Sequence, residues 1–108
     1  MLFRSANGPT TPAADLILNE RWNDVFVIPD ILCNAGGVIV SYFEWVQGLQ
    51  QFFWNETETM DRLFRILEQA FMVVIKRAKE SKISHRTAAM AIGVERVLAA
   101  KKSRGLFP

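Results

Sequence analysis

Cysteine is almost absent from this sequence of 108 residues, because Cys33 is the only one. A single thiol excludes an internal disulfide and a metal site built from several cysteines, and it fits a reducing compartment. Charge of one sign is also scarce, since 13 basic and 11 acidic residues give a formal net charge of +2. The only basic cluster, Lys101, Lys102 and Arg104, falls at the end of a predicted helix and complements its dipole. The charge pattern therefore indicates no nucleic-acid partner.

Long hydrophobic runs are missing as well, although half of the residues are hydrophobic and a core is possible. The longest candidate, residues 38–53, is interrupted by Glu44 and Gln47. It falls short of the roughly 20 apolar residues that a membrane helix needs. The first five residues contain an arginine and no apolar stretch, which is not the pattern of a secretory signal peptide. We therefore expect no membrane span and a cytoplasmic location.

The first half of the chain shows helix and strand patterns in turn. The Thr11-Pro12 pair is typical of an N-cap followed by proline, and it predicts a helix that runs to about residue 21. Residues 25–28 are all apolar and β-branched or aromatic, which predicts a strand buried on both faces. A loop of small residues, 33–37, then leads to a second helix over residues 38–53. This order indicates part of an α/β crossover unit.

The second half of the chain carries helix signals only. Asn55, with Glu58 three residues later, predicts a capping box, and apolar residues at three- and four-residue steps predict one long helix through residue 78. Ser84 is the expected cap of a last helix, and Gly105 is its expected end. An aromatic cluster between the second and third helices is expected to be core or a subunit contact. Its members are Trp45, Phe52, Phe53 and Trp54.

Three blocks of sequence resemble a known family in order and spacing. They are Ala6-Asn7-Gly8-Pro9-Thr10-Thr11-Pro12, then Phe26-Val27-Ile28-Pro29-Asp30, then Asn34-Ala35-Gly36-Gly37-Val38 through Ser41-Tyr42-Phe43-Glu44-Trp45-Val46-Gln47. The chain resembles glutamate dehydrogenase, of the glutamate, leucine, phenylalanine and valine dehydrogenase family. Residues 86–89 and 94–97 also look like the last helix of the family. The resemblance is to a carboxyl-terminal fragment, and only the first five residues fall outside it.

The resemblance implies an α/β fold. Residues 1–55 would form the carboxyl-terminal part of a Rossmann-like NAD(P)-binding domain with one or two strands, of which residues 2–3 could be one. Residues 56–108 would be helices that return toward the hinge. The implied reaction is the reversible oxidative deamination of L-glutamate to 2-oxoglutarate and ammonia, with hydride passing to NAD or NADP. The parent enzyme would be a homo-oligomer, and a hexamer is its expected form.

The resemblance also assigns site residues. It places Asn7 and Asn34, with Gly36 and Gly37, at the nicotinamide end of the cofactor, and Ser41 at the side-chain carboxylate of glutamate. Amides both donate and accept hydrogen bonds, glycines let a ligand approach the backbone, and a hydroxyl donor would select glutamate over apolar amino acids. Without the resemblance, Asn7 is more simply a turn residue and Ser41 a helix serine. Asn34 is then either a helix cap or a ligand contact.

Most of the chemistry of a dehydrogenase has no counterpart in this sequence. The family's glycine-rich phosphate loop, acidic ribose-binding residue and catalytic lysine and aspartate are missing, so no catalytic residue is named. His85 has no second ligand at metal-binding spacing and is expected to be an exposed helix residue. We therefore predict a fragment that is inactive alone. The alternative is a free-standing helical module that binds a partner through its exposed helix faces.

Overall fold

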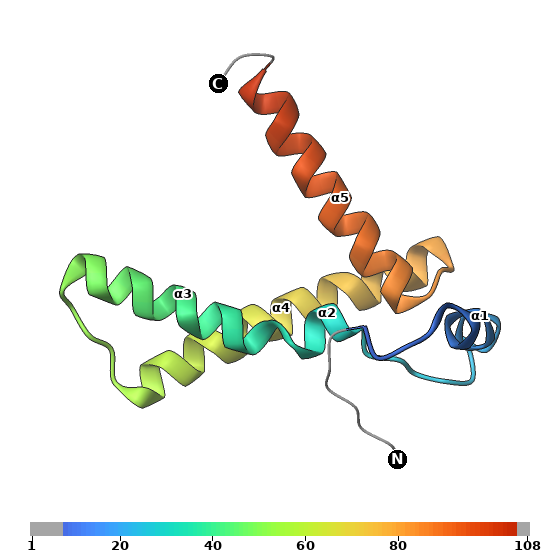
Figure 1. Ribbon diagram of the computed structural model, residues 1–108, viewed down its shortest axis with the longest axis horizontal. Helices are drawn as coiled ribbons and strands as arrows, with labels where there is room; N and C mark the ends of the chain where they lie inside the picture. The colour runs from blue at the N-terminus through green and yellow to red at the C-terminus, as the bar shows by residue number, and fades with distance from the viewer. Residues whose placement is uncertain (1–7, 106–108) are drawn as a thin grey trace.

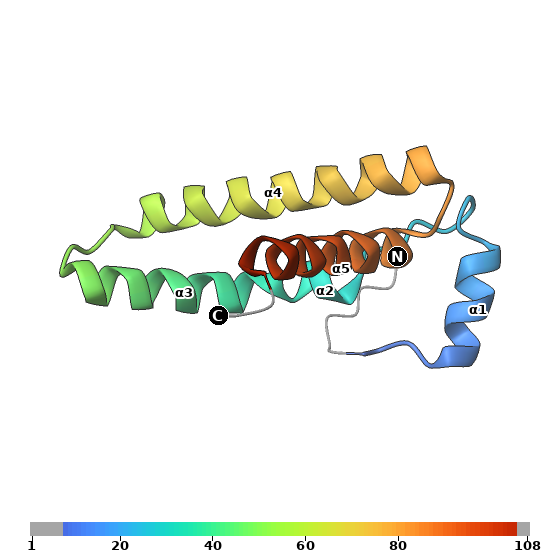
Figure 2. The same ribbon diagram turned by 90° about the horizontal axis from the view of Figure 1, so that it is seen from above.

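The computed structural model describes residues 8–105, which form five helices and no strand. The helices are α1 (Pro12–Glu20), α2 (Asp30–Cys33), α3 (Ala35–Gln50), α4 (Glu56–Ser81) and α5 (His85–Arg104). Helices α3 and α4 form an antiparallel hairpin (Figure 1). Helix α1 lies beyond the end of the hairpin that is opposite the α3–α4 turn, and α5 rises away from the hairpin. The view from above separates the two long helices of the hairpin (Figure 2).

The predicted starts of α1, α4 and α5 are confirmed, and each of these starts has a local capping bond. The Thr11 hydroxyl accepts a hydrogen bond from the first turn of α1 at 3.3 Å, and the Ser84 hydroxyl does the same for α5 at 3.3 Å. Asn55 and Glu58 form the predicted capping box, with both reciprocal bonds at 2.9 Å. Gly105 ends α5 with φ +73°, a backbone conformation that suits glycine.

The predicted strand at residues 25–28, and with it the α/β fold class, is wrong for the part of the chain that the structure describes. The segment is an irregular link between α1 and α2. Phe26 is 61% exposed and its ring packs against Phe71 of α4 and His85 of α5, with centroids 6.2 and 4.5 Å away. A strand needs a neighbouring strand for its ladder, and the neighbours of this segment are helices. The other candidate strand, residues 2–3, lies outside the described residues.

His85 differs from the exposed helix residue that the sequence predicts. Its ring is partly buried against Phe26, and its Nδ1 atom lies 3.0 Å from the carbonyl oxygen of Val27, within hydrogen-bond distance. His85 thus attaches the link between α1 and α2 to the first turn of α5.

The predicted loop at residues 33–37 is largely helical. Residue 33 ends the short helix α2, and α3 begins at Ala35, three residues before the predicted start. The same helix ends at Gln50 and does not reach the predicted residue 53, because Gln51 adopts a left-handed conformation with φ 50°. The glycine pair therefore belongs to the first turn of α3.

The core of the described chain lies where α4 meets α5. Val74 and Ala78 of α4 are buried against Ala88 and Ala89 of α5, and the alanines allow the two helices to approach closely. The partly buried residues around this cluster are Leu32, Ile83 and Ile92. An ion pair between Arg77 and Glu95 also joins the two helices. The base of α5 is thus fixed on α4.

The end of the hairpin at the turn between α3 and α4 is held by a buried glutamine. Gln47 is only 8% exposed, its amide nitrogen donates to the carbonyl oxygen of Phe43 at 3.2 Å, and its Oε1 accepts from the backbone nitrogen of Trp54 at 2.6 Å. The Trp54 ring packs edge-on against Phe43 and under Arg62. Of the predicted aromatic cluster only Trp54 is packed in this way, while Trp45, Phe52 and Phe53 are exposed.

Replacing Gln47 with leucine is expected to loosen this connection. The backbone N–H of Trp54 would lose its acceptor, and an unsatisfied buried donor costs about 1 to 3 kcal/mol. Amide hydrogen exchange at Trp54 should accelerate and the free energy of unfolding should fall. Gln50→Leu is the matched control, because Gln50 is an exposed glutamine of the same helix. Equal rates of amide hydrogen exchange at Trp54 in the two variants would contradict the assigned role of Gln47.

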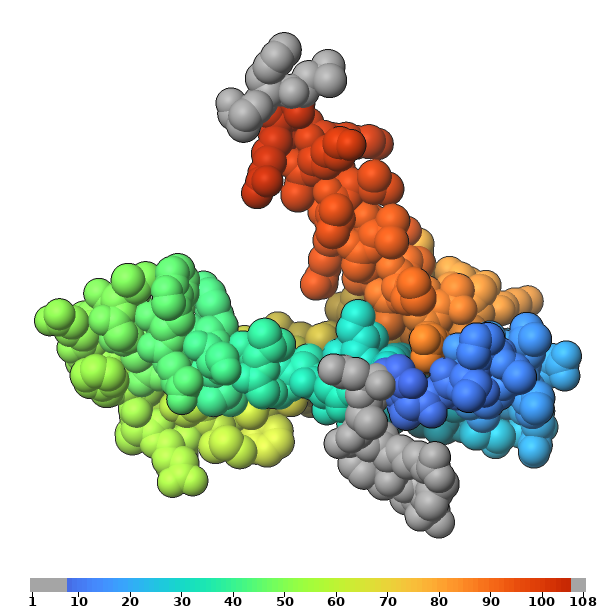
Figure 3. Space-filling model, in the orientation of Figure 1, coloured from blue at the N-terminus to red at the C-terminus, as the bar shows by residue number. Residues whose placement is uncertain are grey.

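Much apolar surface of this chain is left uncovered. Its accessible surface is 8931 Å², whereas a compact monomer of this size has about 6,100 Å². All of residues 93–105, the outer half of α5 and its C-cap, are exposed and project as an arm (Figure 3). The large exposed apolar residues of this arm are Val94, Val97 and Leu98. Such a surface is typical of a segment that packs against other polypeptide.

Candidate functional site

The junction between α2 and α3 brings together most of the predicted site residues. Asn34 connects the two helices, Gly36 and Gly37 lie in the first turn of α3, and Ser41 lies one turn further on. In an α-helix a spacing of seven residues returns to nearly the same face, about 10 Å along the axis. Asn34 and Ser41 therefore share one face of α3, with Gly37 beside them, and Gly36 lies on the other side of the turn. Asn7 lies outside the described residues.

The face that carries Ser41 points away from α4. Ser41 is exposed, while Phe43 and Gln47 on the opposite side of the helix are buried in the hairpin. The neighbours of Ser41 on the exposed face are mostly large and apolar, namely Val38, Tyr42, Trp45 and Leu49. A polar hydroxyl within such a face would be desolvated together with its neighbours once the face is covered.

The glycine pair is not required by the packing of this chain. A β-carbon added at Gly36 or Gly37 would meet no other atom within 4 Å. Glycine inside a helix is less stable than alanine by roughly 0.5 to 1 kcal/mol. Within the described residues, no packing contact therefore requires glycine at either position.

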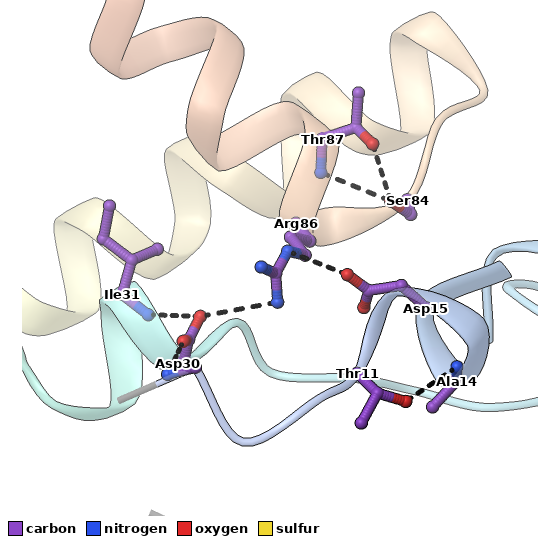
Figure 4. Close-up of polar contacts among 9 residues, drawn as sticks. Thr11, Ala14, Asp15, Asp30, Ile31, Ser84, Arg86 and Thr87 are labelled. Atoms are coloured by element: carbon purple, nitrogen blue, oxygen red, sulfur yellow. Dashed lines mark hydrogen bonds and ion pairs between the residues drawn. The ribbon is translucent and has the colours of Figure 1, made fainter. Parts of the chain in front are cut away.

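Asp30 connects the site to the turn at Gly8 and to α5, and through Arg86 to α1 (Figure 4). Its Oδ2 accepts a hydrogen bond from the backbone nitrogen of Gly8 at 2.9 Å, and its Oδ1 accepts one from Ile31 at 3.1 Å. Its carbonyl oxygen accepts from the backbone nitrogen of Asn34 at 2.9 Å. Arg86 of α5 lies between two acids, with Nη1 3.9 Å from Asp30 Oδ1 and Nε 3.4 Å from an oxygen of Asp15 on α1.

Sequence reasoning missed both Asp30 and Arg86. In the sequence, Asp30 stands out only as the last residue of the second block that resembles the family, and Arg86 only as part of residues 86–89. One local signal for Asp30 was available, because an acidic residue directly after proline is favoured in the first turn of a helix. The pairing of Asp30 with Arg86 depends on the fold and has no local signal.

The described residues show no further centre of chemistry. Between residues 8 and 105, no three His, Cys, Asp or Glu side chains are grouped as a metal site. One shallow groove lies between α1 and α5 and includes Asn19, Met90 and Val94, and another includes Ile28, Leu32 and Phe71. Neither groove is lined by Asn34, Gly36, Gly37 or Ser41. No helix in this range is long and apolar enough to cross a membrane.

Comparison with known sequences gives matches over nearly the whole chain. The chain is 50% identical to a glutamate dehydrogenase of Thermotoga maritima over 107 residues, which are 99% of this chain and 25% of the relative. It is 45% identical to an NAD-specific glutamate dehydrogenase of Staphylococcus aureus over 105 residues, 97% of this chain and 25% of the relative. The chain thus spans about a quarter of the length of these relatives.

Solved structures give the same result for the fold. A hetero-hexameric glutamate dehydrogenase of Thermus thermophilus, in a Leu-bound form, superposes with a TM-score of 0.87 at 34% identity, over 96% of this chain and 24% of that one. A glutamate dehydrogenase of Peptoniphilus asaccharolyticus gives 0.85 at 38% identity, over 95% and 25%.

The resemblance found in the sequence is therefore confirmed. The family model of glutamate, leucine, phenylalanine and valine dehydrogenases matches residues 1–105. At this coverage the similarity extends beyond the three motif blocks, and this chain belongs to the glutamate/leucine/phenylalanine/valine dehydrogenase family.

Proposed function

We propose that this chain forms the part of an NAD(P)-dependent glutamate dehydrogenase that faces the nicotinamide ring and selects glutamate. The observation that supports this most directly is the face of α3 on which Gly37 and Ser41 are exposed, and to which the helical spacing also brings the half-buried Asn34. The similarity to several enzymes named glutamate dehydrogenase supports the choice of substrate.

In this proposal the chain binds and orients, and proton transfer belongs to other parts of the enzyme. The amides of Asn7 and Asn34 bind the carboxamide or a ribose hydroxyl of NAD or NADP, because an amide both donates and accepts. Gly36 and Gly37 let the cofactor approach the start of α3, where the helix dipole favours negative charge. Hydride transfer is the chemistry of the cofactor, and correct alignment of donor and acceptor is what the protein supplies.

Ser41 selects the substrate in this proposal. Its hydroxyl donates a hydrogen bond to the side-chain carboxylate of glutamate, on a face that becomes dry when the cleft closes. A site built around such a donor rejects leucine, phenylalanine or valine, because the donor would be left buried and unpaired. The apolar neighbours of Ser41 exclude water from this contact.

The remaining parts of the proposal concern the parent enzyme. Residues 1–55 contribute to its NAD(P)-binding domain, and residues 56–108 lead back toward the hinge. The parent acts in the cytoplasm as a homo-oligomer, with a hexamer as the expected state. The uncovered apolar surface of α3 and α5 supports such packing against further polypeptide.

A segment exchange tests the proposed function. A chimeric enzyme in which this chain replaces the matching quarter of the Thermotoga maritima glutamate dehydrogenase should reduce NAD or NADP with glutamate as donor. The isolated chain should neither reduce the cofactor with glutamate nor bind NAD tightly, because it lacks a phosphate-binding loop. The measurement is glutamate-dependent formation of reduced cofactor, with the unaltered Thermotoga enzyme in parallel. Activity of the isolated chain, or a folded chimera without activity, would refute the proposal.

The alternative function is a helical interaction module, and the exposed arm of α5 is the observation that favours it. Such a module would be folded and monodisperse as the isolated chain and would unfold cooperatively. Size-exclusion chromatography and urea unfolding of the isolated chain measure these properties. A continuous reading frame upstream that encodes a glycine-rich phosphate loop would instead support the dehydrogenase.

A further inference from the structure

We propose that Asp30 is a positioning residue that fixes the turn at Gly8 and the junction at Asn34 relative to each other, so that Asn34 meets the nicotinamide end of the cofactor. This inference rests on the proposed function and adds a residue that acts through the backbone. Arg86 of α5 holds the Asp30 carboxylate in place.

Both segments are attached to this single residue. The Oδ2 atom of Asp30 accepts from the backbone nitrogen of Gly8, the residue that follows Asn7 in the sequence, and the distance is 2.9 Å. The carbonyl oxygen of Asp30 accepts from the backbone nitrogen of Asn34, also at 2.9 Å. Gly8 and Asn34 are far apart in sequence, and Asp30 bonds directly to the backbone nitrogen of both.

The Asp30 side chain is itself held from two sides. Its second oxygen, Oδ1, accepts from the backbone nitrogen of Ile31 at 3.1 Å and lies 3.9 Å from Arg86 Nη1. The side chain is only 21% exposed. Hydrogen bonds to an ionised carboxylate are stronger than those between neutral groups, so the carboxylate has little freedom to turn.

Gly8 is suited to this arrangement. Its φ is +57°, in the left-handed region that other residues rarely adopt, and the turn there directs the backbone N–H toward Asp30. The turn that follows Asn7 is thus shaped by glycine and fixed by Asp30. Small displacements of cofactor-binding groups are costly, because a misplacement of 1 Å can lower a rate by about 100-fold.

The test compares Asp30→Ala with Asp30→Asn in the active chimeric enzyme. Asp30→Ala should lower kcat/KM for the cofactor by about 10- to 100-fold. Asp30→Asn keeps one acceptor oxygen and should cause a smaller loss. Binding of ADP-ribose, which lacks nicotinamide, should stay within about twofold, since the perturbed groups lie at the other end of the cofactor. Asp24→Asn is the matched control, because it removes only the exposed Arg21–Asp24 ion pair of 3.8 Å.

Each outcome decides for or against the positioning role. A lower kcat/KM for the cofactor, with unchanged ADP-ribose binding, supports the positioning role. Unchanged kinetics in Asp30→Ala, or an equal loss of cofactor and ADP-ribose binding, overturns it, because the second result is that of a general structural residue. If Asp30→Ala does not assemble, Asp30→Asn decides with the same two readouts. An inactive chimera before any substitution would instead refute the proposed function.

Discussion

Replacing Ser41 with valine in the chimeric enzyme is expected to lower kcat/KM for glutamate by about 5- to 150-fold, which corresponds to about 1 to 3 kcal/mol for a buried carboxylate that loses its donor. The KM for the cofactor should stay nearly unchanged. Ser41 is exposed in this chain and packs against no other helix, so the substitution should not disturb the hairpin. Steady-state kinetics with each substrate varied in turn measure both effects.

Two further variants test whether the effect depends on the hydroxyl of Ser41 and not simply on replacing an exposed helix serine. Ser41→Thr keeps the hydroxyl and should retain most of the activity. Ser103→Val changes another exposed helix serine, on the arm of α5, and should leave glutamate kinetics unaltered. Unchanged glutamate kinetics in Ser41→Val would rule out the assigned role.

Replacing Gly37 with alanine should have opposite effects on stability and on cofactor use. The fold has room for the added methyl group, and alanine should stabilise α3 by roughly 0.5 to 1 kcal/mol. The same methyl group would stand where the proposed cofactor approaches the backbone. Overpacking costs typically 1 to 3 kcal/mol, so the KM for NAD or NADP should rise by about 5- to 150-fold.

Gly48→Ala is the matched control for this experiment. Gly48 lies in the same helix and is equally open to a β-carbon, but it is three turns beyond the glycine pair. This variant should gain stability without a change in cofactor KM. Thermal unfolding and cofactor kinetics of the two variants are the measurements. A Gly37→Ala enzyme with normal cofactor KM would remove the glycine pair from the proposed site.

Helices α1, α4 and α5 could be predicted because their start signals are local. The capping box of Asn55 and Glu58 involves residues three apart, and it forms in the structure as the sequence indicates. The segment 25–28 could not be predicted in the same way. Four apolar β-branched or aromatic residues suit a buried strand, but they equally suit a link whose Phe26 packs on the faces of two helices. The choice depends on neighbours that are distant in sequence.

The candidate site was predictable in part. Asn34, the glycine pair and Ser41 lie within eight consecutive positions, so their closeness followed from the sequence, whereas the sequence predicted a loop where the structure has Asn34 as the N-cap and the glycines in the first turn of α3. The network of Asp30, Arg86 and Asp15 joins three helices across more than half of the chain. Nothing in the spacing of these residues indicates that they meet, because ion pairs between distant helices leave no periodic signal.

The arm formed by the outer half of α5 has a mechanical consequence. Residues 93–104 are about 18 Å long, and their tip lies about 22 Å beyond the alanines that fix the base of the helix. By lever geometry, a rotation of ~10° at that base moves the tip by ~4 Å. Arg86 lies at the base of this lever and contacts Asp30. A displacement of the tip by such a rotation is therefore several times larger than the displacement at the Arg86–Asp30 contact, which lies close to the pivot.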